Sequence, residues 1–407
     1  MPVIRVGTAS PATGPTKAAT LRHLSDLARR AAAQSIDILL LPEAYIGGYP
    51  RGTAFGAVIG DRPYEGREEF ARYFDQAADL GDTVGGGAGA GARWVKRELG
   101  GDDDLPRGDG TREELEKIAS DTGVFIVTGI IEKTGGSLYC AVVYVCPKAG
   151  IIGKRRKVMP TGTERLCWAQ GSPATLKAVS TVIRGQRVNI GAAICWENYM
   201  PFVRQALYEQ NINLYLAPTA DGRDAWMGLM RTVGVEGRCF VVSSNMAVRK
   251  DGSARVASSQ PSPTRARARR SSTFTDQGFE IALPSVSPTR RRRRKSVFDE
   301  DGNEIVLGCD ESNGAERNGT APGAQPKSTV ATADGWVSRG GSSIVNPFGD
   351  VLAGPQWEDD EGLIFADIDL RECIRGRLDL DTAGHYSRND SFKFTTKNGT
   401  VDMDASA

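Results

Sequence analysis

The stretch that decides the fold of this chain is VNIGAAICWENYMP, residues Val188–Pro201. It begins as an apolar run broken by small residues and turns abruptly polar after Ile194. An apolar run with polar boundaries is typical of a buried strand. In layered α/β proteins chemistry collects just past the carboxyl ends of strands, and Cys195 occupies that position. The stretch therefore predicts a nucleophilic thiol, with a buried unreactive cysteine as the alternative.

Two earlier strand ends carry further reactive groups. The apolar run Ile36–Leu41 predicts a buried strand, and the proline that follows it places Glu43 just past the strand end. The segment Ile151–Gly153 predicts another strand and runs into the basic stretch KRRKVMPTGTERLCW, Lys154–Trp168. Taken alone, Glu43 is better explained as an acid in the first turn of a helix or in a surface loop, and the basic cluster as a solvated face. The turn that follows the cluster leaves room for at least one lysine to point inward.

Alternating strands and helices fill the rest of the chain and predict a sheet layered with helices. Further strands are expected at Val3–Ala9, Gly123–Lys133, Leu138–Cys146, Ile212–Pro218, Arg238–Asn245 and Gly362–Leu370, with a hairpin at Val337–Pro355. Helices are expected at Thr16–Ala33, Arg67–Leu80, Thr111–Thr122, Pro201–Gln210 and Ala225–Gly237, with a short helical patch at Trp94–Leu99.

Composition narrows the possible chemistry. The chain has 407 residues, of which 40% are hydrophobic, and a net charge of +1, which points to neither nucleic acid nor membrane as a partner. We see no secretory signal and no apolar run of about 20 residues, and the seven cysteines form no CxxC pair. A reducing, cytoplasmic location is therefore expected. With only two histidines, sites built on several histidines, Ser-His-Asp or Cys-His are disfavoured.

Residues 249–336 break the α/β pattern. They are rich in Ser, Pro, Thr, Arg and Gly, and the segment after Ser262 is echoed by the segment after Ser287. This composition predicts a duplicated, largely disordered insertion in a single domain formed by residues 1–248 and 337–394, followed by a tail at 395–407. The arginine runs are expected to be a solvated linker; the alternative is an arm that binds RNA or another anionic partner on a non-catalytic scaffold.

A thiol, a carboxylate and an ammonium group can together form a nucleophilic site without histidine. The stretches LPEAYIGGYPRG, RRKVMPTGTERLCW and AAICWENYMP resemble, in order and spacing, the three signature regions of the nitrilase branch of the carbon-nitrogen hydrolase superfamily. This resemblance implies a four-layer αββα sandwich. It also implies that Cys195 is the nucleophile, Glu43 the general base, Lys157 the catalytic lysine and Glu164 a second glutamate that supports the site.

The resemblance further implies hydrolysis of a nitrile through a cysteine thioimidate and a thioester, with no metal or organic cofactor. Tyr49, Trp168 and Trp196 are expected to contact the substrate, and the chain is expected to form homo-oligomers, with spirals as one form. Arg155 departs from the family, which often has histidine two residues before the catalytic lysine. An amidase or carbamoylase of the same superfamily would use the same three residues and stays open as an alternative.

Overall fold

The protein is described by a computed structural model that covers residues 3–81, 108–250 and 335–387, together with four short strands between residues 272 and 307. The chain divides into two compact units, residues 1–256 with 329–407, and residues 257–328. Every candidate site residue belongs to the first unit. Within the described residues no helix is long and apolar enough to cross a membrane.

The first sheet of the larger unit has six strands in the order β17-β1-β2-β3-β4-β5. Neighbours β1, β2 and β3 are parallel, whereas β3, β4 and β5 form an antiparallel meander and β17 pairs antiparallel with β1. The strands are β1 (Ile4–Ala9), β2 (Ile38–Leu40), β3 (Phe125–Thr134), β4 (Ser137–Cys146), β5 (Gly150–Arg156) and β17 (Leu363–Ile368).

The second sheet has seven strands in the order β10-β15-β9-β8-β7-β6, with β16 also paired to β15. Its centre is the parallel trio β7, β8 and β9. The strands are β6 (Val179–Ile183), β7 (Gln186–Ala192), β8 (Leu214–Thr219), β9 (Phe240–Asn245), β10 (Ala247–Arg249), β15 (Trp336–Val345) and β16 (Val351–Trp357).

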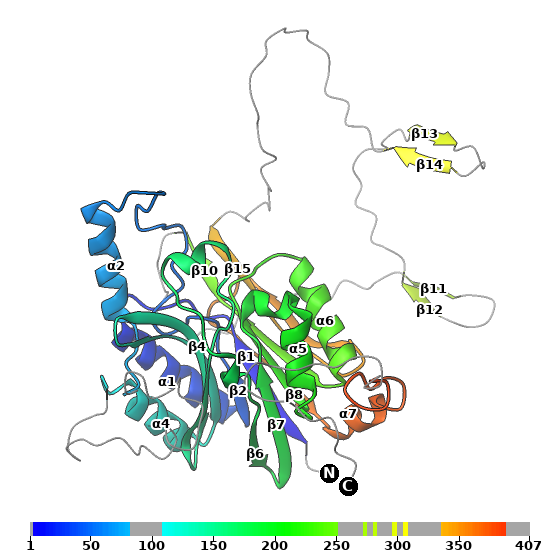
Figure 1. The fold of residues 1–407 in the computed structure, drawn as a ribbon. Helices are drawn as coiled ribbons and strands as arrows, with labels where there is room; N and C mark the ends of the chain where they lie inside the picture. Colours follow the sequence, from blue (N-terminus) through cyan, green and yellow to red (C-terminus); the bar gives the residue numbers. More distant parts are fainter. Residues whose placement is uncertain are drawn as a thin grey trace. The chain divides into compact units, whose positions relative to one another are not determined.

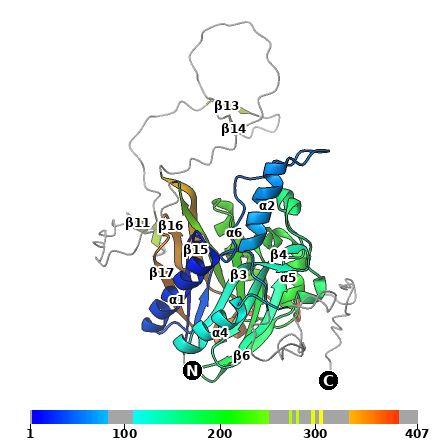
Figure 2. The same ribbon diagram turned by 90° about the vertical axis from the view of Figure 1, so that its left-hand side faces the viewer.

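Helices cover the outer face of each sheet, and this arrangement confirms the expected four-layer αββα sandwich (Figure 1). The first sheet is covered by α1 (Lys17–Ala33) and α4 (Thr111–Thr122). Figure 2 views the unit from the side of these two helices. The second is covered by α5 (Pro201–Tyr208) and α6 (Ala225–Gly237). Two further helices are α2 (Tyr64–Gln76) and α7 (Arg371–Gly376). Helix α1 begins where the Thr16 hydroxyl accepts a hydrogen bond from the Ala19 N–H.

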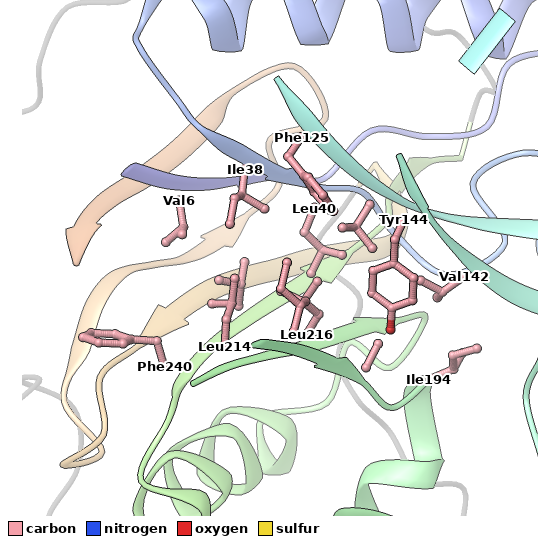
Figure 3. Close-up of a cluster of buried hydrophobic side chains, with 14 of the residues drawn as sticks. Val6, Ile38, Leu40, Phe125, Val142, Tyr144, Ile194, Leu214, Leu216 and Phe240 are labelled. Carbon is pink, nitrogen blue, oxygen red and sulfur yellow. The ribbon is translucent and has the colours of Figure 1, made fainter. Parts of the chain in front are cut away.

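The main hydrophobic core lies between the two sheets. Side chains from β1, β2 and β3 meet those from β8 and β9, as Figure 3 shows for Leu40 and Phe125 opposite Leu214 and Leu216. All of these side chains are essentially inaccessible to water. The alternation of inward and outward residues along each strand assigns one face to this core and the other to the covering helices.

The predicted helices and strands in the described ranges are confirmed, with ends shifted by up to four residues. Outside the insertion, strand β6, the three-residue strand β10 and helix α7 were not predicted from the sequence. Strand β6 alternates between half-buried and exposed residues at the sheet edge, and α7 has only six residues, so neither leaves a strong apolar pattern. The patch expected at Trp94–Leu99 lies outside the described residues.

The insertion starts and ends at neighbouring positions of the second sheet. Strand β10 pairs antiparallel with β15, and the Lys250 N–H donates to the Gly335 carbonyl at 2.9 Å. Each copy of the repeat holds one hairpin in the same register: Phe274 pairs with Glu280, and Phe298 with Glu304. These hairpins are β11 (Ser272–Phe274) with β12 (Glu280–Ala282), and β13 (Lys295–Phe298) with β14 (Glu304–Leu307). The remaining insertion residues lie outside the described ranges, so its predicted disorder stays a prediction.

Candidate active site

The structure brings together Glu43, Lys157 and Cys195, which follow the carboxyl ends of β2, β5 and β7. Glu43 and Lys157 come from the first sheet and Cys195 from the second, so only the stacking of the two sheets makes them neighbours. All three side chains are buried. Gly129 permits the close approach of the Glu43 segment to β3, because a Cβ there would lie 2.2 Å from the Pro42 carbonyl oxygen.

Cys195 occupies a strained turn. It opens a short 3₁₀ helix, Cys195–Tyr199, and has a left-handed backbone with φ of 52°, which is uncommon for a residue other than glycine. The Thr219 hydroxyl, at the end of β8, lies 3.3 Å from the sulfur. That hydroxyl oxygen accepts the Asp221 N–H at 3.0 Å, so its own proton is directed at the sulfur.

Burial raises the pKa of the Cys195 thiol, and the nearby Glu43 carboxylate adds to the effect. Lys157, the Thr219 hydroxyl and the Ala220 N–H act in the opposite direction, but the net shift is upward. A thiol with a raised pKa is protonated at neutral pH. To act as a nucleophile, Cys195 would therefore need a neighbouring base.

Glu43 has a free carboxylate oxygen in a fully buried setting. Its Oε1 accepts from Lys157 Nζ at 2.7 Å and faces the Cys140 thiol at 3.6 Å, whereas Oε2 has no hydrogen-bond partner within the described part of the chain. Burial raises the pKa of Glu43, although Lys157 and the Cys195 thiol oppose the shift. A carboxylate with a raised pKa and an unused oxygen is suited to accept a proton.

Lys157 bridges two carboxylates. Its Nζ donates to Glu43 Oε1 and, at 2.8 Å, to Glu164 Oε2. Burial alone would lower the pKa of Lys157, but the negative charges around it outweigh burial and raise it well above its usual value. Glu164 is held in turn by the Tyr49 hydroxyl at 2.9 Å and the Thr161 N–H at 2.7 Å. Lys157 thus carries a positive charge that acts electrostatically on Cys195.

All four side chains of the basic cluster from Lys154 to Lys157 are buried. The sequence predicted only that at least one lysine of the cluster could point inward. Lys154 and Arg156 both donate to Glu132 on β3. Each of the four cations therefore has a carboxylate partner, as burial of charge requires. The solvated-face alternative for this cluster is wrong.

Arg155, the residue that departs from the family pattern, forms a fully buried bidentate pair with Glu197. The two guanidinium nitrogens donate to the carboxylate oxygens at 2.6 and 2.7 Å. Glu197 also accepts the backbone N–H groups of Val158 at 2.7 Å and Ile194 at 2.8 Å. One carboxylate thereby joins the segment of Lys157 to the segment of Cys195.

A cavity of about 370 Å³ opens onto Cys195. It is lined by Tyr49, Arg51, Thr161, Gly162, Thr163, Glu164, Cys195, Trp196, Ala220, Asp221, Gly222 and Arg223. Two residues expected to contact substrate, Tyr49 and Trp196, are in this lining. Trp168 is not; it packs edge-to-face behind Tyr49 with ring centres 5.4 Å apart.

Thr219, Asp221 and Arg223 also lie at the site, although the sequence alone did not single them out. The signal was present, because TADGRD directly follows the strand predicted at Ile212–Pro218 and so lies at the same sheet edge as Cys195. Arg51 was quoted within the first signature stretch but given no role. Its position in the lining depends on a contact to Ala220, which no local pattern predicts.

Comparison with known proteins agrees with this geometry. Residues 5–377 match the carbon-nitrogen hydrolase family. An aliphatic nitrilase of Sinorhizobium fredii is 35% identical over 92% of this chain and 89% of its own. An arylacetonitrilase of Trametes versicolor is 34% identical over 92% and 90%, and nitrilase 2 of Arabidopsis thaliana 34% identical over 93% and 83%.

Solved structures share the fold. A carbon-nitrogen hydrolase from Helicobacter pylori has a TM-score of 0.55 at 14% identity, covering 96% of this chain and 97% of its own. A superfamily protein from Xanthomonas campestris has a TM-score of 0.54, also at 14% identity, covering 97% and 100%. With the extended sequence similarity and the shared fold, this chain belongs to the carbon-nitrogen hydrolase family, in its nitrilase branch.

Proposed function

We propose that the chain is a nitrilase that hydrolyses an organic nitrile to the carboxylic acid and ammonia, with Cys195 as nucleophile. The observation that carries the proposal is the buried Lys157 ammonium, which is bonded to Glu43 and Glu164 beside a cysteine that opens onto a cavity. The names of the three relatives, all nitrilases, support the same substrate class.

The first half of the reaction uses the thiol proton. As the Cys195 sulfur bonds to the nitrile carbon, its proton passes through Glu43 to the nitrile nitrogen and a thioimidate forms. Glu43 then takes a proton from water as the water oxygen adds to the same carbon. That proton and the remaining proton of the added hydroxyl both pass to the nitrogen, so ammonia leaves and a thioester remains on the sulfur.

The second half consumes another water molecule. Glu43 again accepts its proton, the carbon–sulfur bond breaks, and the acid is released while the thiol is restored. Negative charge builds on the attacked group at each addition, and Lys157 stabilises it in a site that largely excludes bulk water. Glu164 and Tyr49 hold Lys157 in place for both halves. Trp196 contacts the substrate from the cavity wall, and Trp168 supports Tyr49 from behind.

The test compares Cys195→Ala, Glu43→Gln and Lys157→Met with the control Cys146→Ala, which removes a thiol distant from the site residues. Nitrile loss and ammonia release are measured on aliphatic, aromatic and arylaliphatic nitriles. We expect no turnover from Cys195→Ala and a loss of about 10²–10⁴-fold from Glu43→Gln. Lys157→Met should be similarly impaired, with the control unchanged.

Mass spectrometry separates the roles further. Wild-type protein quenched during turnover should carry a covalent adduct of the nitrile on Cys195. Glu43→Gln should form this adduct more slowly, because the base that takes the thiol proton is missing, and Cys195→Ala should carry none. Substantial nitrile hydrolysis by Cys195→Ala would remove the nucleophile assignment. Turnover of amides with none of any nitrile would identify the chain as an amidase instead.

A further inference from the structure

We propose that Arg51 makes this site select nitriles that carry a carboxylate at the end remote from the nitrile group. The inference rests on the proposed nitrilase function and names the substrate class for the same cavity. It rests on the charged side chains that line the cavity and on which of them already form ion pairs.

The carboxylates of the lining are occupied. Glu164 is bonded by Tyr49, Lys157 and the Thr161 N–H, as described above. Asp221 accepts from Arg223 Nε at 2.8 Å through one oxygen, and from Arg223 Nη2 at 2.5 Å and Trp196 Nε1 at 2.9 Å through the other. The Arg223 charge is therefore balanced at short range by a bidentate partner.

Arg51 differs from Arg223 in having no carboxylate partner among the described residues. One nitrogen, Nη2, donates to the Ala220 carbonyl at 2.8 Å, and the guanidinium lies 5.3 Å from the centre of the Tyr49 ring. These two contacts fix the orientation of the group in the cavity lining. They leave its other N–H donors available, and a guanidinium presents a fork that matches a carboxylate.

The remaining walls favour a small polar substrate. Thr161 and Thr163 place hydroxyl-bearing residues in the lining, and its larger apolar surfaces are the rings of Tyr49 and Trp196. A long aliphatic or extended aryl tail would find few apolar partners there. A short chain with a nitrile at Cys195 and a carboxylate at Arg51 would satisfy both ends of the cavity.

The test uses the full chain and isosteric substrate pairs: 3-cyanopropanoate with 3-cyanopropanamide, and 4-cyanobutanoate with its amide. Loss of the nitrile is followed by chromatography, because amide hydrolysis also releases ammonia. The variants are Arg51→Gln, which removes the charge but keeps a hydrogen-bond donor on a shorter side chain, and Arg51→Lys, which keeps the charge. Arg62→Gln, an exposed arginine of the same segment, is the matched control.

We expect the wild type to favour at least one carboxylate over its amide by about tenfold or more in kcat/KM, the size of one charge-assisted contact. Arg51→Gln should lose this preference mainly through KM for the anion, and Arg51→Lys should keep part of it. Added salt should weaken the preference, because Arg51 is exposed to solvent screening.

Equal use of carboxylate and amide by the wild type would overturn the inference. So would an Arg51→Gln variant that loses both substrates equally, since Arg51 would then act only as a link to Ala220. Hydrolysis of neutral nitriles with no anionic preference leaves the nitrilase proposal standing and removes this one. Failure on every nitrile removes both.

Discussion

The buried pair of Arg155 and Glu197 gives the sharpest prediction. Arg155→Met removes the cation from a side chain that water does not reach and leaves the Glu197 carboxylate inside the protein. Removing one partner of a buried ion pair costs about 3–5 kcal/mol, because the other charge is left uncompensated. Glu197 would still accept hydrogen bonds from two backbone N–H groups. We therefore expect Arg155→Met to lower the free energy of unfolding by about 3 kcal/mol.

Glu197→Ala should lower the free energy of unfolding more than Arg155→Met does. It leaves the guanidinium without a carboxylate and also strands the N–H groups of Val158 and Ile194. We expect the free energy of unfolding to fall by about 5 kcal/mol, at the upper end of the range for breaking a buried ion pair. The double variant Arg155→Met with Glu197→Ala should lose less free energy of unfolding than the sum of the two single changes, because neither charge of the pair is then left buried without its partner.

Urea unfolding, followed by tryptophan fluorescence, measures these free energies from the transition midpoint. The control is Arg29→Met, which breaks an ion pair with Asp26 on the surface of α1 in which both side chains are about two-thirds exposed. Exposed pairs contribute little. If Arg155→Met shifted the midpoint no more than Arg29→Met, the reasoning about the buried pair would be refuted.

Four further outcomes are expected. Thr219→Val should raise the pH at which iodoacetamide alkylates Cys195, and Thr219→Ser should not; an unchanged profile would mean that the hydroxyl does not act on the sulfur. Burial would raise the pKa of Glu132, but its two cationic partners outweigh burial and lower it. The ionised Glu132 should therefore stabilise the fold fully above the ordinary Glu pKa of about 4.3, and this stabilisation should decline as the pH falls through the lowered pKa. When the free energy of unfolding is measured against pH, Glu132→Gln should lack this decline. Replacing residues 257–328 with a short Gly-Ser linker should preserve nitrile turnover, because the ends of the insertion are already joined by a backbone hydrogen bond; loss of turnover in folded protein would show that the insertion serves the site. Sedimentation velocity should show homo-oligomers, and an active monomer alone would contradict that expectation.

The sequence by itself determined most of the helices and strands and the types of the reactive residues. Buried strands such as β2 and β8 are short continuous apolar runs with clear boundaries, so their residues report burial without any knowledge of their neighbours. Glu43, Lys157 and Cys195 were found because each follows such a run, where a strand gives way to a turn. The motif resemblance then assigned them roles, and it was enough to anticipate the four layers.

Only the tertiary structure decided the partners of these residues. Arg155 and Glu197 are 42 positions apart, and Arg51 and Ala220 are 169 apart. Whether a cation in KRRK faces water or a buried carboxylate depends on how two separate sheets stack, and the local pattern is the same in both cases. Trp168 likewise packs against the ring of Tyr49, which comes from a distant part of the chain, and does not itself line the cavity. Local sequence sets the burial and type of each side chain, whereas the charges and hydrogen bonds that tune it come from segments far along the chain.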